Sequence, residues 1–189
     1  MYTTINKIKA HKPAHCEWKK LLKFLNKTEP DDEPLKISDI VKSNSVDPIW
    51  VLYFVEGHDR EIRLFAVWCA RRAQHLMMSE SSIKALDVAE QYANGKASDK
   101  ELEIARQLAR AAKNAVPLTE QPMAAQAAEW ATQEIAKRTI FAAREAAWAI
   151  AVTTAEASKW TQARLIEFES QKQELLRICI TIENQSNKQ

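Results

Sequence analysis

Glycine and proline are scarce in this sequence, which has only two glycines and six prolines among its 189 residues. Glycine provides the left-handed backbone of tight hairpin turns and phosphate-binding loops, so a glycine-rich phosphate loop is excluded and β-hairpins are disfavoured. Alanine, glutamate, glutamine, lysine, arginine and leucine are common instead, and all of them favour helix. The composition therefore predicts an all-α fold with almost no sheet.

Cysteine is also scarce, and its three positions are far apart: Cys16, Cys69 and Cys179. No two of them have the spacing of a metal site or a redox motif, and Cys69 lies on an apolar stripe, where a thiol behaves as a small hydrophobe. The nucleophile, zinc and phosphate motifs of common enzyme families are missing as well. We therefore expect no metal, no cofactor and no enzymatic activity, in a reducing compartment.

The sequence has neither a long apolar run nor an excess of one charge. No stretch approaches the roughly twenty apolar residues of a membrane span, and the first residues lack the apolar core of a signal peptide. The 27 Lys and Arg nearly balance the 25 Asp and Glu, and the net charge of +2 is too small to indicate a nucleic-acid or membrane partner. We expect a cytoplasmic protein with no membrane partner.

The most core-like stretch is residues 61–76, EIRLFAVWCARRAQHL. Its apolar residues recur at helical spacing and form one broad stripe, made of Ile62, Leu64, Phe65, Trp68, Cys69 and Leu76. The spacing predicts a central helix that begins after Gly57, ends near Met77 and organises the rest of the fold.

Shorter helices are expected before the central one. The proline-containing stretch 28–34 predicts a solvent loop. After it, Leu35, Ile37, Ile40 and Val41 predict a short helix, capped by Ser38, that stops in the polar run 43–45. The run IWVLYFV at residues 49–55 suits a buried strand or a helix equally well. Asp47 as N-cap before a first-turn proline favours helix, and the sequence offers no second strand for pairing.

Two helices that form an antiparallel hairpin are expected at Ser82–Val116. Serines at 79–82 are N-cap candidates for the first helix, and Gly95 closes it. Ser98 and Glu101 then have the spacing of a capping box, which starts the second helix.

The stretch from residue 123 to 183 contains no glycine or proline. An uninterrupted helix of this length would be roughly 90 Å long, too long for a compact domain. Thr119 is expected to be the N-cap of the first helix in this region, with Pro122 in its first turn. Breaks are expected at Arg138–Ile140 and Val152–Ser158, because threonines and serines there can cap a helix.

The last helix is expected to bury its large apolar side chains, which are Trp160, Leu165, Phe168, Leu175 and Ile178. Residues 184–189 are expected to fray. Together these elements predict a single all-helical domain over residues 1–189, a multi-helix array with antiparallel hairpins.

The candidate binding residues are charged side chains at the start and the end of the central helix: Glu56, His58, Asp59, Arg60, Arg63, Arg71 and Arg72. A histidine beside acids can serve acid–base chemistry or bind a metal, but no second ligand stands at a defined spacing, and acids at a helix N-terminus also serve as caps. Arg72 either pairs with an acid buried between helices or joins an exposed patch. The six tryptophans, interleaved with Arg and Lys, are core residues, stacking platforms for single-stranded nucleic acid, or protein-binding hot spots.

Two segments within residues 27–112 carry a resemblance to a known family: KTEPDDEPLKISDIVKSNSVDPIWVLYFVEGHDREIRLFAVWCARRAQHLM and SIKALDVAEQYANGKASDKELEIARQLARAA. They are most specific at EGHDREIRLFAVWCAR and ALDVAEQYANG. The segments resemble alanine- and tryptophan-rich helical proteins of bacterial and phage genomes, many described as immunity proteins of polymorphic toxin systems. At SNSVDP, relatives tend to carry a glycine and a second acid, and after residue 112 only the composition is similar. The resemblance implies a non-enzymatic protein that binds and neutralises a protein toxin.

We therefore expect an inhibitor that binds a toxin or a host or phage factor through an exposed charged and aromatic face. The alternative is a phage or mobile-element accessory protein that binds nucleic acid, which predicts one contiguous face of Lys and Arg. A third possibility, an enzyme that uses His58 and Asp59, requires a pocket that gathers a second titratable group.

Overall fold

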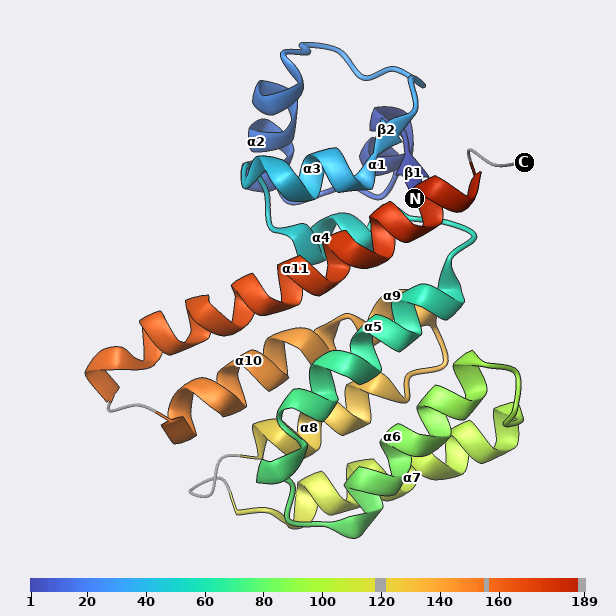
Figure 1. Ribbon diagram of the computed structural model, residues 1–189, viewed down its shortest axis with the longest axis vertical. Coiled ribbons are helices and arrows are strands. Elements are labelled where there is room, and N and C mark those ends of the chain that lie inside the picture. Colours follow the sequence, from blue (N-terminus) through green and yellow to red (C-terminus); the bar gives the residue numbers. More distant parts are fainter. Residues whose placement is uncertain (118–121, 155–156, 187–189) are drawn as a thin grey trace. The chain divides into compact units, whose positions relative to one another are not determined.

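The structure, a computed structural model, describes residues 1–117, 122–154 and 157–186. The chain divides into two compact units: a first unit of Met1–His58 with Lys172–Gln189, and a second unit of Asp59–Gln171. Helices α1 to α11 make up most of the described residues, and the sheet has two strands of two residues each (Figure 1). The prediction of an all-α fold is confirmed, whereas the single-domain organisation stays a prediction. No helix among the described residues combines the length and the apolar character of a membrane span.

The first unit contains short helices around one small antiparallel sheet. Its elements are β1 (Tyr2–Thr3), α1 (Ile5–Ala10), α2 (His15–Leu25), β2 (Leu35–Lys36), α3 (Ile37–Ser43), α4 (Pro48–Val51), the 3-10 helix η1 (Leu52–Phe54) and the end of α11 (Trp160–Ser186). In the sheet, Tyr2 pairs with Lys36 and Thr3 with Leu35. The core of this unit is aliphatic, with Ile5, Ile8, Leu21, Ile37, Ile40, Val51 and Leu52 all buried.

The ambiguous run 49–55 is helical up to Phe54, as its capping residues predict: α4 passes into the 3-10 helix η1, and Val55 is extended. The Asp47 side chain accepts a hydrogen bond from the backbone N–H of Ile49 at 2.8 Å, and Pro48 occupies the first turn of α4. The predicted loop at 28–34 is also confirmed, and Lys27 forms ion pairs with Asp31 and with Glu33 there.

Ser38 does not cap α3, contrary to the sequence prediction. Lys36 is the N-cap residue, and Ser38 lies buried inside the helix, where its hydroxyl donates to Glu183 Oε2 at 2.7 Å. The Met1 ammonium group lies 3.5 Å from the other oxygen of the same carboxylate. Ser38 therefore bonds Glu183, which is distant in the sequence, although its local position predicted an N-cap role.

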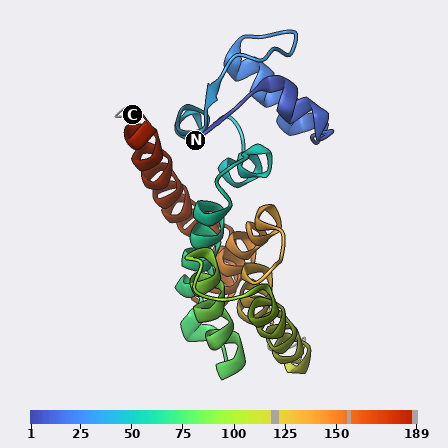
Figure 2. The ribbon, with the colours of Figure 1, turned by 90° about the vertical axis from the view of Figure 1, so that its right-hand side faces the viewer.

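The second unit is built around α5 (Asp59–Arg72), which packs on α6, α8, α9 and α10 (Figures 1 and 2). The buried residues of α5 include Ile62, Phe65 and Cys69, so the central helix and its core stripe are confirmed. Its end is not at Met77 as predicted, because the backbone leaves the helix after Arg72 and forms a 3-10 turn, η2 (Gln74–Leu76).

The helices α6 (Glu80–Ala93) and α7 (Asp99–Ala115) form the predicted antiparallel hairpin (Figure 1). Ser79 caps α6, and Gly95 has a φ of 69°, a left-handed conformation that suits the end of a helix. Ser98 and Glu101 form the predicted capping box. These local signals were sufficient because every partner lies within a few residues along the chain.

The glycine-free stretch is interrupted, as expected, although at one place that the sequence did not indicate. Helix α8 (Met123–Ala131) ends before Thr132, whose hydroxyl donates to the Glu129 carbonyl at 2.8 Å; α9 (Ala136–Thr139) and α10 (Phe141–Thr154) follow. The predicted breaks near Ile140 and after Val152 are confirmed. Pro122 is the N-cap residue of α8 and lies outside its first turn, and Thr119 lies outside the described residues.

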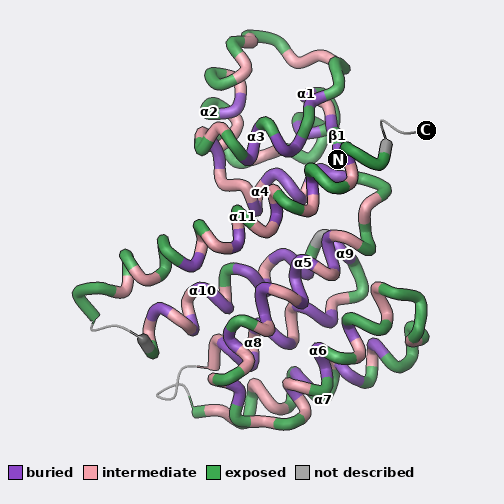
Figure 3. Tube along the Cα trace, viewed as in Figure 1, coloured by how far each residue is buried: buried purple, intermediate pink, exposed green. Residues whose placement is uncertain are grey.

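Alanine determines how the second unit packs. The buried alanines of α8 and α10 let these helices approach each other and α5 closely, and Figure 3 shows the buried positions gathered between them. A second 3-10 turn, η4 (Ala157–Lys159), precedes α11.

Candidate functional site

The acidic part of the predicted cluster consists of exposed pairs and helix-terminal residues. Glu56 accepts a hydrogen bond from Lys7 Nζ at 2.8 Å, and His58 is half-buried and ends the N-terminal segment of the first unit. Asp59 and Glu61 occupy the first turn of α5, where the helix dipole favours negative charge. Within the described ranges, no three His, Cys, Asp or Glu side chains are grouped so that they could hold a metal ion.

Arg63 is a buried structural tether. Its side chain is 6% exposed and donates to the backbone carbonyls of Gln133, at 2.7 Å, and Glu134. The guanidinium also lies 4.8 Å from the ring centroid of Tyr92. Burial lowers the pKa of Arg63, and the nearby Tyr92 and acidic groups counteract this. Arg63 therefore ties the turn between α8 and α9 to α5.

Arg60 and Arg71 join α5 to α6 on the surface. Arg60 donates to Asn94 Oδ1 at 2.8 Å, whereas Arg71 donates to Asp87 at 2.8 Å and to Glu90 at 2.6 Å. Both acids that contact Arg71 are about half exposed, so these ion pairs contribute little to stability. They make this surface one of mixed charge.

Arg72 pairs with a buried acid, which was one of the two roles that the sequence left open. Its Nε and one terminal nitrogen donate to the two oxygens of Glu167 at 2.6 and 2.7 Å, and the Glu167 carboxylate is 3% exposed. The guanidinium lies 5.0 Å from the ring centroid of Trp68, and the hydrogen bond to Glu167 raises the pKa of Arg72. Gln171 donates to the same carboxylate at 3.3 Å.

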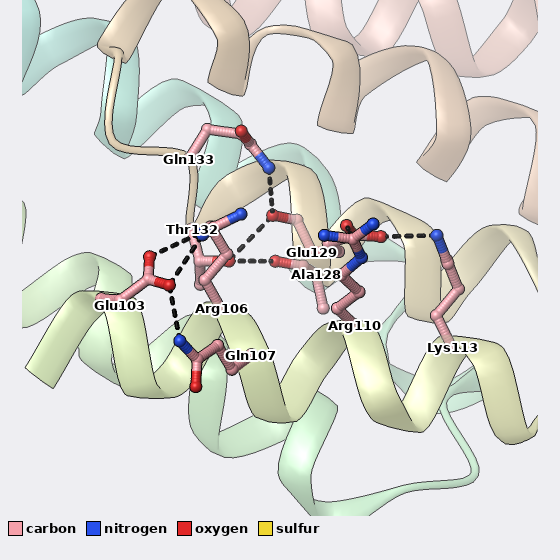
Figure 4. A network of polar contacts seen from close by, with 9 residues as sticks. All are labelled: Glu103, Arg106, Gln107, Arg110, Lys113, Ala128, Glu129, Thr132 and Gln133. Atoms are coloured by element: carbon pink, nitrogen blue, oxygen red, sulfur yellow. Dashed lines mark hydrogen bonds and ion pairs between the residues drawn. The ribbon is translucent and has the colours of Figure 1, made fainter.

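A second mixed-charge network joins α7 and α8 (Figure 4). Glu103 accepts two hydrogen bonds from Arg106, and Glu129 lies 2.8 Å from Lys113 and 3.9 Å from Arg110. Acids and bases therefore alternate along this surface, and it is not uniformly basic.

Aromatic rings and an arginine come together where α10 meets the first turns of α11. Trp148 and Trp160 contact edge to face, with ring centroids 6.0 Å apart. The Arg164 guanidinium lies 5.4 Å from the ring centroid of Trp148 and 5.1 Å from that of Phe168, within cation–π distance of both rings.

Two aliphatic side chains beside this cluster are exposed to solvent. Leu165 is 61% exposed and Ile166 is 63% exposed. They border a shallow hollow lined by Ser158, Thr161, Gln162, Leu165, Ile166 and Glu169. We name two adjoining sides of α11 together the aromatic–arginine face: one side carries Arg164 with Trp148, Trp160 and Phe168, and the next carries Leu165 and Ile166, which follow Arg164 around the helix.

The prediction that the last helix buries Leu165 is wrong. The inward positions of this stretch are Glu167 and Gln171, because Glu167 receives Arg72 and Gln171 donates to the Ala143 carbonyl at 2.9 Å. Polar pairing therefore sets the orientation of the helix and turns apolar residues outward. In the structure the buried positions of this helix recur every four residues, at Glu167, Gln171, Leu175, Cys179 and Glu183, but these residues share no hydropathy that would have marked them in the sequence.

Comparisons of this chain with family models, with curated proteins and with solved structures find no match. The resemblance of residues 27–112 to immunity-type proteins, and the binding roles of the seven charged residues, stay predictions.

Proposed function

We propose that the chain is a non-enzymatic, protein-binding inhibitor of the immunity type. It binds and neutralises a protein toxin, or a host or phage factor, in the cytoplasm. The observation that carries this proposal is the aromatic–arginine face, where exposed Leu165 and Ile166 occupy the side of α11 that adjoins Arg164 and its aromatic rings.

The composition of this face supports a protein partner. Tryptophan and arginine are the residue types most enriched among binding hot spots. Burial of an exposed Leu or Ile side chain contributes about 1.5 to 3 kcal/mol, so covering Leu165 and Ile166 favours association. Because Arg164 already contacts the Trp148 and Phe168 rings, it loses less conformational freedom on binding than an unrestrained arginine does.

The charge pattern argues against the nucleic-acid alternative. Such a partner requires a contiguous basic face and counterion release. In the described parts of α5 to α8, basic side chains instead stand beside acids: Arg71 contacts Asp87 and Glu90, and Lys113 contacts Glu129.

The location of the face is consistent with an inhibitor. The resemblance to immunity-type proteins covers residues 27–112, and the aromatic–arginine face lies outside that segment. Inhibitors of one fold that neutralise different toxins must differ where they contact the toxin, because specificity is a difference between affinities.

The test is affinity capture from nuclease-treated bacterial lysate at low and at moderately high salt, followed by identification and purification of the retained protein. We expect one protein to be retained at both salt concentrations. Its affinity should fall about tenfold or more for Leu165→Glu, which places a charge where an apolar contact forms. Arg164→Ala should weaken binding similarly.

The matched control is Leu108→Glu, since Leu108 is a similarly exposed leucine of α7, 52% exposed. It should leave the affinity of a single aromatic–arginine face for the retained protein unchanged. If material is retained only when nucleic acid is present, and is lost as the salt concentration rises, the protein is a nucleic-acid-binding accessory protein and not an inhibitor. A partner that binds the wild type and Leu165→Glu equally would exclude this face.

A further inference from the structure

A groove with an apolar floor runs along the outer side of the α6–α7 hairpin. Ala85, Val88 and Ala105 belong to its apolar floor, and Ile104 and Leu108 of α7 form one edge. The hollow has a volume of about 310 Å³ and is lined by Ser81, Lys84, Ala85, Val88, Gln91, Ala97, Glu101, Ile104, Ala105 and Leu108.

An apolar ridge follows this edge. Ile104 is 48% and Leu108 is 52% exposed, and the exposed residues Ala111 and Ala115 continue the line. The positions are separated by alternating four and three residues, which is the seam spacing of paired helices. Leu102, Ala105 and Ala109 are buried on the adjoining side of α7, so this helix is apolar on two neighbouring sides.

A partner that fills the groove must contact it through side chains, because both walls are helices whose backbone N–H and C=O groups are already hydrogen-bonded within the helix. An extended peptide would bury its own backbone groups there without partners. The occupant therefore has an apolar ridge on a helix. This chain presents such a ridge directly beside the groove, which is the self-complementary arrangement that two-fold dimers require.

The charges at the two ends of the groove are complementary between copies. The helices α6 and α7 run side by side from the turn at 94–98, and Lys84 of α6 and Leu108 of α7 lie at the same height along the hairpin, equally far from this turn. Glu101 of α7 lies at the end of the groove near the turn. A two-fold axis that crosses α7 between Ile104 and Leu108 sets Ile104 of each copy against Leu108 of the other. It also brings Glu101 of one copy within about one helical turn of the level of Lys84 of the other.

Lys84 is available for this contact. It lies 2.8 Å from Glu80, but both side chains are more than two-thirds exposed. An exposed ion pair of this kind contributes little free energy, so Lys84 can change partner from Glu80 to a second copy with little loss of stability. Glu101 accepts hydrogen bonds from Ser98 and keeps a full negative charge at the edge of the groove.

We propose that the α6–α7 face binds a second copy of this chain, with the two α7 helices antiparallel and Glu101 of each copy paired with Lys84 of the other. The aromatic–arginine face takes no part in this contact, so dimerisation and inhibitor binding can be tested separately.

The first experiment measures the mass of the full-length chain by sedimentation equilibrium over a wide concentration range. The wild type should approach twice the 21.5 kDa of one chain as its concentration rises. Leu108→Glu should raise the dimer dissociation constant about tenfold or more, and Leu165→Glu, its control on α11, should leave it unchanged. Circular dichroism verifies that each variant is folded.

The second experiment uses charge reversal. Lys84→Glu and Glu101→Lys should each dimerise less than the wild type, because each places like charges together at both ends of the contact. Mixed in equal amounts, they should form a heterodimer in which both cross-copy pairs are again opposite in sign. Glu101→Lys also removes the capping-box carboxylate, but a variant that failed only through misfolding would not recover on mixing.

A wild type that stays monomeric at every concentration overturns the proposal and leaves the groove to a helix of a different protein. A dimer that Leu108→Glu does not weaken, or charge variants that do not recover on mixing, overturns it as well, because the contact then lies elsewhere.

Discussion

The pair of Arg72 and Glu167 gives the most direct test of what holds the second unit together. Glu167 comes from α11, 95 residues away from Arg72 of α5, and its carboxylate is 3% exposed. Replacing Arg72 by alanine leaves this carboxylate buried with only the 3.3 Å hydrogen bond from Gln171 among the contacts described. Such an uncompensated charge costs several kcal/mol because the interior does not replace the water that the charge lost.

The expected magnitude follows from burial. Breaking a buried ion pair by removing one partner costs about 3 to 5 kcal/mol, and the arginine end is 37% exposed, which favours the lower value of about 3 kcal/mol. For a chain of 189 residues this lowers the melting temperature by about 6 to 12 °C. Urea unfolding and thermal unfolding, both followed by circular dichroism, measure the two quantities.

The neighbouring Arg71 is the matched control, since its partners Asp87 and Glu90 are about half exposed. Arg71→Ala should cost less than about 1 kcal/mol. Replacing both Arg72 and Glu167 by methionine should recover most of the stability, because a buried pair can often be exchanged for apolar side chains without loss. If Arg72→Ala and Arg71→Ala were equally destabilising, the argument from burial would be refuted.

Three further predictions concern a cap, an acid and the thiols. Ser98→Ala removes the capping box of α7 and should cost about 1 kcal/mol in urea unfolding, whereas Ser98→Asp should retain most of the stability. Burial raises the pKa of Glu145 in the folded state. Its ionisation therefore begins to destabilise the folded state when the pH exceeds the pKa of the unfolded chain, about 4.3, and the loss is complete above the raised pKa of the folded state. Glu145→Gln should therefore be more stable than the wild type at neutral pH, and this advantage should vanish as the pH falls below about 4.3; a constant difference would contradict it. Cys16 is exposed, whereas burial raises the pKa of Cys179 to about 12, so iodoacetamide should label Cys16 first, and Cys16→Ser should abolish the fast phase.

The inference of self-association has a consequence for the proposed inhibitor. A dimer presents two aromatic–arginine faces, so it can engage two toxin molecules or one dimeric toxin. Leu108→Glu separates these effects, because it removes the second face from the assembly and leaves each single face intact.

Much of the local structure could be predicted from the sequence. The cap at Asp47, the capping box of Ser98 with Glu101, and the apolar stripe of α5 all depend on residues a few positions apart. Such features depend on residues that are close together in the sequence, so the sequence alone is sufficient to predict them. The helical state of residues 49–54 followed from the same reasoning.

The tertiary structure alone decided how the elements use their polar side chains. Ser38 bonds Glu183 across 145 residues, Arg63 reaches a turn 70 residues away, and Arg72 selects Glu167. These buried charges and hydroxyls need partners, and no spacing in the sequence reveals where a partner will be. Because Glu167 and Gln171 face inward to provide partners, Leu165 and Ile166 face outward. The sequence by itself therefore determined most of the helices and the local caps at Asp47, Ser79 and Ser98, whereas packing determined which surface the helices expose, since satisfying a buried charge outweighs burying one more aliphatic side chain.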